Sequence, residues 1–148
     1  GVALVGCVKT CHFAEGIAPA TAHEWDEEYN DLKLAIKIVA NLDEAISFIN
    51  KHGSGHTDTI ITQNPETIEK FMNEVNSASV ICNASTRFAD GFRYGLGAEI
   101  GISTNKTHAR GPVGLEGLVI YKYKVYGNGQ IVSDYSGENA RSFTHKPL

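Results

Sequence analysis

Short apolar runs recur along the first half of the chain at intervals that suit strands. Residues 2–8 read Val-Ala-Leu-Val-Gly-Cys-Val, and residues 33–40 are rich in branched apolar side chains. Two shorter runs follow at residues 58–62 and 79–82. Runs of this length that contain β-branched residues predict four buried strands.

Amphipathic helices are predicted between the last three of these strands. Asn41 and Asn64 stand where a side-chain oxygen can cap the exposed amides of a helix, and Pro65 suits the first helical position. Behind each cap, apolar residues follow at the i, i+3, i+4, i+7 spacing of one helical face: Leu42, Ala45, Ile46 and Ile49, then Ile68, Phe71, Met72 and Val75. This alternation predicts an α/β fold of βαβ units with a mostly parallel sheet.

The remaining segments follow other patterns. Residues 9–25 have mixed composition with two helix breakers, so we interpret them as a connector. Residues 83–114 hold six glycines and no sustained periodicity, and a run this long inside a compact domain is usually functional. Residues 117–126 alternate between apolar and polar side chains and predict a long strand. The polar tail, residues 135–148, is expected to be loosely ordered.

Composition excludes several classes of protein. The net charge is −4 and the 13 basic residues form no cluster, which argues against a nucleic-acid partner. No apolar run approaches the length of about 18 residues that a membrane span needs. Three cysteines make no even disulfide framework, which favours reduced thiols and a cytoplasmic location. The chain begins with Gly1 rather than Met, so we expect a portion of a longer protein.

Several motifs suggest chemistry only weakly. The glycines at 95, 97 and 101 have GxGxxxG spacing but follow no predicted strand, so we interpret them as a loop that packs close to a pocket. His52 and His56 are four apart, yet glycines between them break the helix that would align them on a zinc ion. We predict no metal site.

Cys82 and two arginines leave alternatives open. Cys82 ends a strand beside Asn83, whose amide could stabilise an oxyanion in thiol acyl transfer. A free cysteine at the end of an apolar run can equally fill a core. Arg87 and Arg110 flank the glycine-rich segment, and a guanidinium suits carboxylate or phosphate. Each could equally form a surface ion pair.

A series of motifs in order carries a family resemblance. The most specific are Asn83-Ala84-Ser85-Thr86-Arg87-Phe88, Gly95-Leu96-Gly97-Ala98-Glu99-Ile100-Gly101 and His108-Ala109-Arg110-Gly111-Pro112. They are preceded by Glu28-Tyr29 and by His52-Gly53-Ser54-Gly55-His56-Thr57-Asp58. From about residue 24 to 130 the chain resembles gamma-glutamyl phosphate reductase, also called glutamate-5-semialdehyde dehydrogenase, of the aldehyde dehydrogenase superfamily.

The resemblance implies a reaction and its participants. In this family NADPH reduces L-glutamyl 5-phosphate to L-glutamate 5-semialdehyde and phosphate through a cysteine thioester, in proline biosynthesis. The nucleophilic cysteine and the cofactor domain lie N-terminal to the matched residues, so no catalytic nucleophile is expected in this chain, and Cys82 occupies a different place. Glu28 matches the glutamate that contacts the nicotinamide ribose. The residues expected at the substrate are Asn83, Ser85, Thr86 and Arg87, with His108 and Arg110 as second choices.

The resemblance also implies a division of the chain. Residues 1–116 correspond to the distal part of the catalytic domain, and residues 117–134 to a strand and turn that pair with a partner subunit, giving a homodimer or higher homo-oligomer. Residues 135–148 form the tail. Two alternatives remain open, namely an inactive truncated paralogue that dimerises and, from the residues alone, a small thiol enzyme that uses Cys82.

Overall fold

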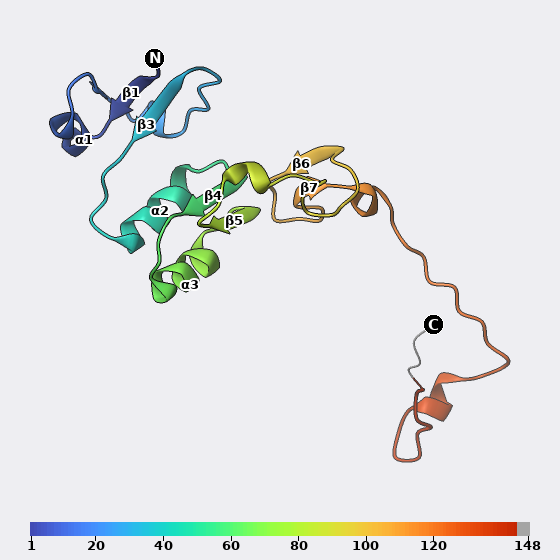
Figure 1. Cartoon of the computed structure of the whole chain (residues 1–148). Coiled ribbons are helices and arrows are strands. Elements are labelled where there is room, and N and C mark those ends of the chain that lie inside the picture. The colour runs from blue at the N-terminus through green and yellow to red at the C-terminus, as the bar shows by residue number, and fades with distance from the viewer. Residues whose placement is uncertain (145–148) are drawn as a thin grey trace.

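The computed structural model describes residues 1–144, whose strands form three small sheets (Figure 1). The first contains β1 (Ala3–Gly6), β2 (Ala18–Pro19) and β3 (Lys33–Ile36) in the order β2-β1-β3, with both pairs parallel. The second pairs β4 (Thr57–Ile60) with β5 (Ser79–Cys82) in parallel. The third pairs β6 (Gly101–Ser103) with β7 (Gly111–Val113) antiparallel.

The two predicted helices form where their caps indicate. Helix α2 (Leu42–His52) begins after Asn41, whose Oδ1 accepts the amide of Glu44 at 2.9 Å. Helix α3 (Pro65–Glu74) begins after Asn64, whose Oδ1 accepts the amide of Thr67 at 3.0 Å. Each cap satisfies an amide that the helix itself leaves unpaired. The α/β class, both helices and the four strands are therefore confirmed, although the strands at 2–8, 33–40 and 58–62 are shorter than predicted.

A small core joins these helices to the β4–β5 sheet. Ile46 of α2 is buried with Phe71 of α3 and with Val75, which ends that helix. Side chains from α2 and from both strands pack around them, namely Leu42, Ile49, Ile60 and Val80. This contact packs α2 and α3 against the β4–β5 sheet, and the part of the cavity wall described below that includes Thr86 and Arg87 follows β5.

The predictions of a connector at residues 9–25 and of a single parallel sheet were each wrong in part. Residues 9–25 contain most of α1 (Val8–Phe13), as well as β2 and a 3-10 turn, η1 (His23–Trp25). Helix α1 has no periodic apolar face. It is held by buried Thr10, whose hydroxyl donates to the carbonyl of Ile36 at 3.0 Å. Within the described chain β3 pairs with β1 and β4 pairs with β5, so the parallel strands lie in two sheets rather than one.

The second half of the chain also departs from prediction. The segment 83–114 includes η2 (Thr86–Phe88) and the β6–β7 pair rather than loop alone. The strand predicted at 117–126 does not form, because η3 (Leu115–Leu118) is followed by a segment with no neighbouring strand to bond. The tail contains η4 (Val132–Tyr135), and the ring of Tyr135 stacks on Phe143. Residues 145–148 of the predicted tail lie outside the described residues. Among residues 1–144 no helix is long and apolar enough to cross a bilayer.

Replacing Phe71 with Ala tests the core. Phe71 is 3% exposed, so truncation should lower the free energy of unfolding by about 3–5 kcal/mol. Phe13 is 84% exposed and serves as the matched control, because Phe13→Ala creates no cavity. Urea titration followed by helical ellipticity measures both, and equal midpoints for the two variants would contradict this core.

Candidate functional site

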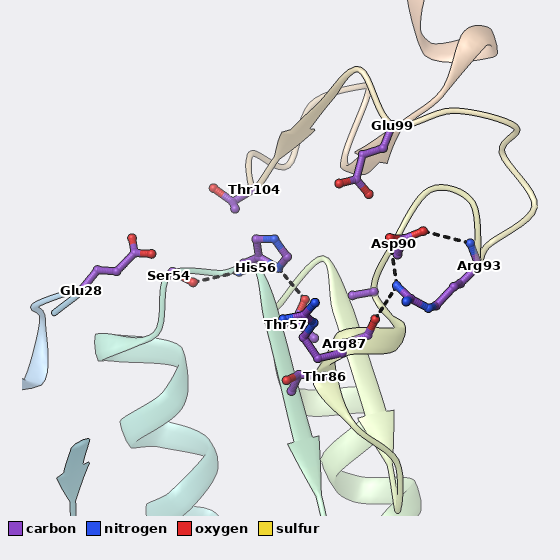
Figure 2. Close-up of a pocket in the computed structure, with 11 residues that line it drawn as sticks. Glu28, Ser54, His56, Thr57, Thr86, Arg87, Asp90, Arg93, Glu99 and Thr104 are labelled. Atoms are coloured by element: carbon purple, nitrogen blue, oxygen red, sulfur yellow. Dashed lines mark hydrogen bonds and ion pairs between the residues drawn. The ribbon is translucent and has the colours of Figure 1, made fainter. Parts of the chain in front are cut away.

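A cavity of about 680 Å³ lies beside the start of β4, and its walls come from segments far apart in the sequence (Figure 2). Its size is typical of a small-molecule site. It is lined by Glu28, Ser54, His56, Thr57, Thr86, Arg87, Ala89, Asp90, Arg93, Glu99 and Thr104. These residues precede β3, join α2 to β4, follow β5 and flank β6.

The turn at Asn83 brings the segment after β5 back to the start of β4. Asn83 has a φ of 52°, in the left-handed region that asparagine tolerates better than most residues. Its side-chain amide accepts the Thr62 amide at 2.9 Å and donates to the Thr62 carbonyl at 2.7 Å. The returning chain is then held where the Thr59 hydroxyl donates to the Ala84 carbonyl at 3.0 Å. Asn83 thereby places η2 alongside β4.

Arg87 presents an unpaired cation to the cavity. Ser85 caps the η2 turn by accepting the Arg87 amide at 3.2 Å. The Arg87 guanidinium itself is exposed and has no hydrogen-bond or ion-pair partner within residues 1–144. An arginine in this state can bind a carboxylate or phosphate through two parallel hydrogen bonds.

Arg93, by contrast, makes contacts that hold the same loop. Arg93 Nη1 forms an ion pair with Asp90 Oδ2 at 2.9 Å, and the same nitrogen donates to the Arg87 carbonyl at 3.0 Å. Asp90 Oδ1 accepts the amides of Phe92 and Arg93 at 2.8 and 3.1 Å. The Arg93 amide, followed by that of Phe92 and then by the positive charges of Arg93 and Arg87, lowers the pKa of Asp90 below its usual range. The carboxylate therefore stays charged and forms its ion pair with Arg93, whereas the Arg87 guanidinium makes no ion pair within residues 1–144 and stays open to a ligand.

Glu28 supplies a free carboxylate to the same cavity. It lies in the exposed loop before β3 and appears at the left of Figure 2, beside Ser54 and His56. Its side chain accepts no hydrogen bond from the described part of the chain. The other glutamate on the cavity, Glu99, is occupied, since its Oε2 accepts the amide of Gly91 at 2.7 Å. Of these two glutamates, Glu28 is therefore the one available to hydroxyl groups of a ligand.

The cavity contains three of the seven predicted site residues, Glu28, Thr86 and Arg87. Asn83 and Ser85 shape its wall from behind through the contacts described above. His108 and Arg110 line a second cavity of about 490 Å³, between the loop at Gly95 and η3. Arg110 Nη2 donates to the Asn76 carbonyl, which ties the β6–β7 pair to the segment before β5.

The alternative sites receive little support from the geometry. Cys82 is half-buried at the end of β5 and does not line the 680 Å³ cavity. One N–H of the Asn83 side-chain amide beside it donates to the Thr62 carbonyl, which holds that amide in the turn after β5. His52 contacts Asp26 Oδ1 at 2.6 Å. Residues 1–144 contain no group of three or more His, Cys, Asp or Glu side chains that could hold a metal ion.

Sequence reasoning missed the polar residues that complete the cavity, above all Asp90 and Arg93. A local signal was present, because Asp before Gly often starts a turn in which the carboxylate accepts amides two and three residues ahead. Arg93 is the third residue after Asp90 and follows that pattern. Ser54, Glu99 and Thr104 reach the cavity only through the tertiary fold, and no local sequence pattern distinguishes them.

Comparison with known proteins identifies the family. No protein-family model matches the chain. The gamma-glutamyl phosphate reductase of Pelotomaculum thermopropionicum is 58% identical over 147 residues, covering 99% of this chain and 33% of the relative. That of Brachyspira hyodysenteriae is 66% identical over 125 residues, covering 84% of this chain and 29% of the relative. The chain belongs to the gamma-glutamyl phosphate reductase family. This confirms the resemblance that the motifs predicted.

A solved structure in the family agrees with the fold. The crystal structure of gamma-glutamyl phosphate reductase from Thermotoga maritima superposes with a TM-score of 0.84 at 50% identity, covering 88% of this chain and 32% of that one. The mixed α/β architecture with parallel strands is therefore that of the family. The chain spans about a third of the length of the curated relatives it matches.

Replacing Asn83 with Ala tests the turn that forms the cavity. The variant loses both hydrogen bonds to Thr62 and places a Cβ-bearing residue without a local hydrogen bond at positive φ. The free energy of unfolding should fall by about 2–3 kcal/mol. Asn73 is the matched control, since its amide contacts only Glu69 on the exposed face of α3. A urea midpoint for Asn83→Ala equal to that of Asn73→Ala would contradict the assignment.

Proposed function

We propose that this chain is part of an NADPH-dependent reductase of the aldehyde dehydrogenase superfamily, acting in the cytoplasm in proline biosynthesis. The whole enzyme converts L-glutamyl 5-phosphate to L-glutamate 5-semialdehyde and phosphate through a cysteine thioester. The names of the relatives support the activity, and the cysteine belongs to a segment N-terminal to the matched residues. The single observation that carries the assignment here is one cavity with an unpaired Arg87 and an unpaired Glu28.

Arg87 holds the α-carboxylate of the substrate in this proposal. Its planar fork is preorganised for two parallel hydrogen bonds, because the η2 turn fixes its backbone and Asp90 removes the competing charge of Arg93. Thr86 on the same turn adds a hydroxyl at the cavity wall. His108 and Arg110 lie on the other cavity, which makes them the weaker candidates for binding the phosphate.

Glu28 contacts the nicotinamide ribose in this proposal. The cofactor supplies a hydride when it is bound. The carboxylate fits that neighbour, because it is exposed at the cavity and both its oxygens lack a partner within residues 1–144. Hydrogen bonds from two ribose hydroxyls to a charged acceptor would orient the ring rather than only retain it.

A chimeric reductase gives the test of substrate binding. In it, this chain replaces the matching third of the Pelotomaculum relative, and that relative is the parent control. Arg87→Ala should raise the KM for L-glutamate 5-semialdehyde, assayed in the oxidative direction, by about tenfold or more. The KM for NADP⁺ should change by less than about twofold.

Arg141→Ala is the matched control for Arg87, since Arg141 lies in the tail, 3.9 Å from Asp134. A chimera without reductase activity while the parent is active would contradict the proposed function. An unchanged substrate KM in Arg87→Ala would remove the carboxylate role from Arg87 alone.

The segment after η3 supplies a second, separate proposal about the partner. Residues 119–126 extend away from the rest of the fold without a strand neighbour (Figure 1). From residue 120 onward their apolar side chains are almost fully exposed, with Ile120 at 97% and Tyr123 and Val125 at 90%. An apolar segment with free backbone groups is suited to joining the sheet of another chain. We propose that it pairs with a second copy, giving a homodimer or higher oligomer.

Replacing Tyr123 with Pro tests this pairing. Proline removes a backbone donor and is poorly tolerated inside a paired strand, so the chimeric reductase should become monomeric. Tyr123→Thr keeps the donor and a strand-forming side chain and should remain oligomeric. Light scattering after size-exclusion chromatography measures the mass. An oligomer that survives Tyr123→Pro would contradict the pairing.

A further inference from the structure

The loop that carries Glu28 into the cavity has an internal support of its own. Glu28 lies between β2 and β3, and its one hydrogen bond within residues 1–144 is weak, with the Asn30 side-chain amide donating to its carbonyl at 3.5 Å. Its side chain is free, as described above. The position of the Glu28 carboxylate therefore depends on how the rest of the loop is held.

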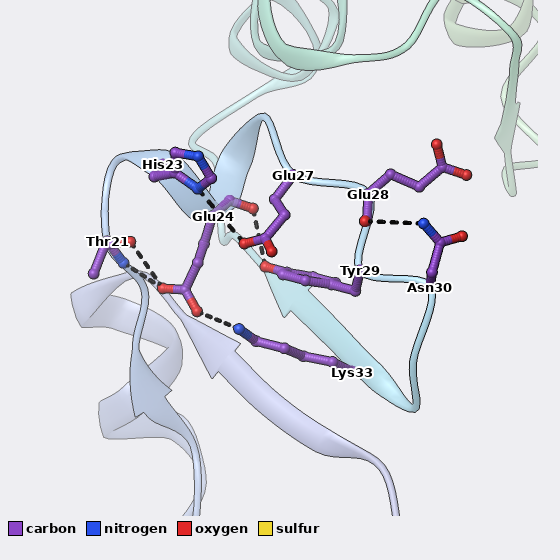
Figure 3. A network of polar contacts seen from close by, with 8 residues as sticks. All are labelled: Thr21, His23, Glu24, Glu27, Glu28, Tyr29, Asn30 and Lys33. Atoms are coloured by element: carbon purple, nitrogen blue, oxygen red, sulfur yellow. Dashed lines mark hydrogen bonds and ion pairs between the residues drawn. The ribbon is translucent and has the colours of Figure 1, made fainter.

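Glu24 is the centre of that support (Figure 3). Its Oε2 accepts the amide and the hydroxyl of Thr21 at 2.7 and 3.1 Å, and its Oε1 pairs with Lys33 Nζ at 2.6 Å. The Glu24 and Lys33 side chains are 13% and 29% exposed, so water competes little for this contact. Lys33 belongs to β3, so the ion pair fastens the start of the loop to the strand at its end.

Tyr29, the residue that follows Glu28, contacts both residues of this ion pair. Its hydroxyl donates to the Glu24 carbonyl at 2.9 Å, and the Lys33 ammonium lies 4.4 Å from the centre of its ring. Tyr29 is thus held at its hydroxyl by the Glu24 backbone and at its ring by the Lys33 ammonium. Figure 3 shows Tyr29 directed toward Glu24 and Lys33, while the neighbouring Glu28 side chain points away from them. Because Glu28 precedes Tyr29 directly, holding the Tyr29 ring limits the positions that the Glu28 backbone can take.

The other side of the loop is fixed to α2. Trp25 meets Phe48 edge to face, with ring centres 5.4 Å apart. Asp26 contacts His52 Nδ1 at 2.6 Å at the end of the helix. Between this anchor and β3 lies only the short segment 27–32, which contains Glu28.

We propose that Glu24, Lys33 and Tyr29 form a positioning clasp, which sets the Glu28 carboxylate in the cavity and thereby strengthens binding of the nicotinamide cofactor. The proposal rests on the proposed function, in which Glu28 contacts the ribose. The three residues touch neither substrate nor cofactor and act through Glu28.

Direct cofactor binding to the chimeric reductase tests the clasp. Lys33→Met removes the cation but keeps most of the side-chain length, and it should weaken the calorimetric Kd for NADP⁺ by about fivefold to tenfold. Lys33→Arg should restore most of the affinity. Hydrogen exchange should speed up in the loop 26–32 of Lys33→Met. Lys70→Met is the matched control, because Lys70 pairs with Asp43 between α3 and α2 and has no contact with the loop.

A double variant separates the clasp from the role of Glu28. If the clasp acts through Glu28, then Glu28→Gln with Lys33→Met should bind NADP⁺ no more weakly than Glu28→Gln alone. A weaker Kd in Glu28→Gln with no change in Lys33→Met would overturn the clasp and leave the proposed function intact. Independent, additive losses would also overturn it. No change of Kd in Glu28→Gln would overturn the ribose contact itself, and the clasp with it.

Discussion

The two hydrogen bonds between the Asn83 amide and the Thr62 backbone are the constraint on which the cavity depends. Parallel pairing of β4 and β5 puts the end of β5 at the opposite edge of the sheet from the start of β4. Arg87 follows β5, whereas His56 and Thr57 precede or begin β4. These side chains can share a cavity only if the chain reverses after β5. Asn83 makes that reversal in a left-handed conformation and holds it with its own side chain.

In the rest of the site, the existing contacts decide which charged side chains remain available to a ligand. Asp90 compensates Arg93, and Glu99 accepts a backbone amide, so neither pair competes for a ligand. Arg87 and Glu28 remain, one on each of two supports: the η2 turn attached to β4, and the loop attached to β3 and α2. A carboxylate-bearing substrate and a ribose are the ligand groups that such a pair would accept. The core of Ile46, Phe71 and Val75 holds the sheet on which one of those supports rests.

Much of the fold could be predicted because its signals are local. Asn41 and Asn64 cap helices through contacts three residues away, and the strand at 79–82 has the predicted bounds. Helix α1 was missed because it has no apolar periodicity, and the hydrogen bond that ties it to β3 runs from Thr10 to Ile36, 26 residues away. The strand at 117–126 stays a prediction, because its expected neighbour belongs to a second subunit and a strand forms only when another strand bonds it.

For the site, the residues that line the cavity could be predicted better than the role of each residue. Arg87, Thr86 and Glu28 line one cavity, and their roles toward a ligand stay predictions. Asn83 is different, since its residue type suits both a ligand contact and a turn, and only the backbone angle and the contact with Thr62 reveal the turn. Asp90 and Arg93 were overlooked although Asp90 before Gly91 is a local turn signal, because the ion pair between them exists only in the folded loop.

The structure of the chimeric reductase with bound NADP⁺ is the most direct test of a cavity shared by these two supports. The account predicts a Glu28 carboxylate oxygen within about 3.2 Å of a nicotinamide ribose hydroxyl. It also predicts that the Arg87 guanidinium faces the same cavity, with the Asn83 amide still bonded to Thr62. A Glu28 carboxylate directed away from the cofactor, or an Arg87 on a different surface, would contradict it.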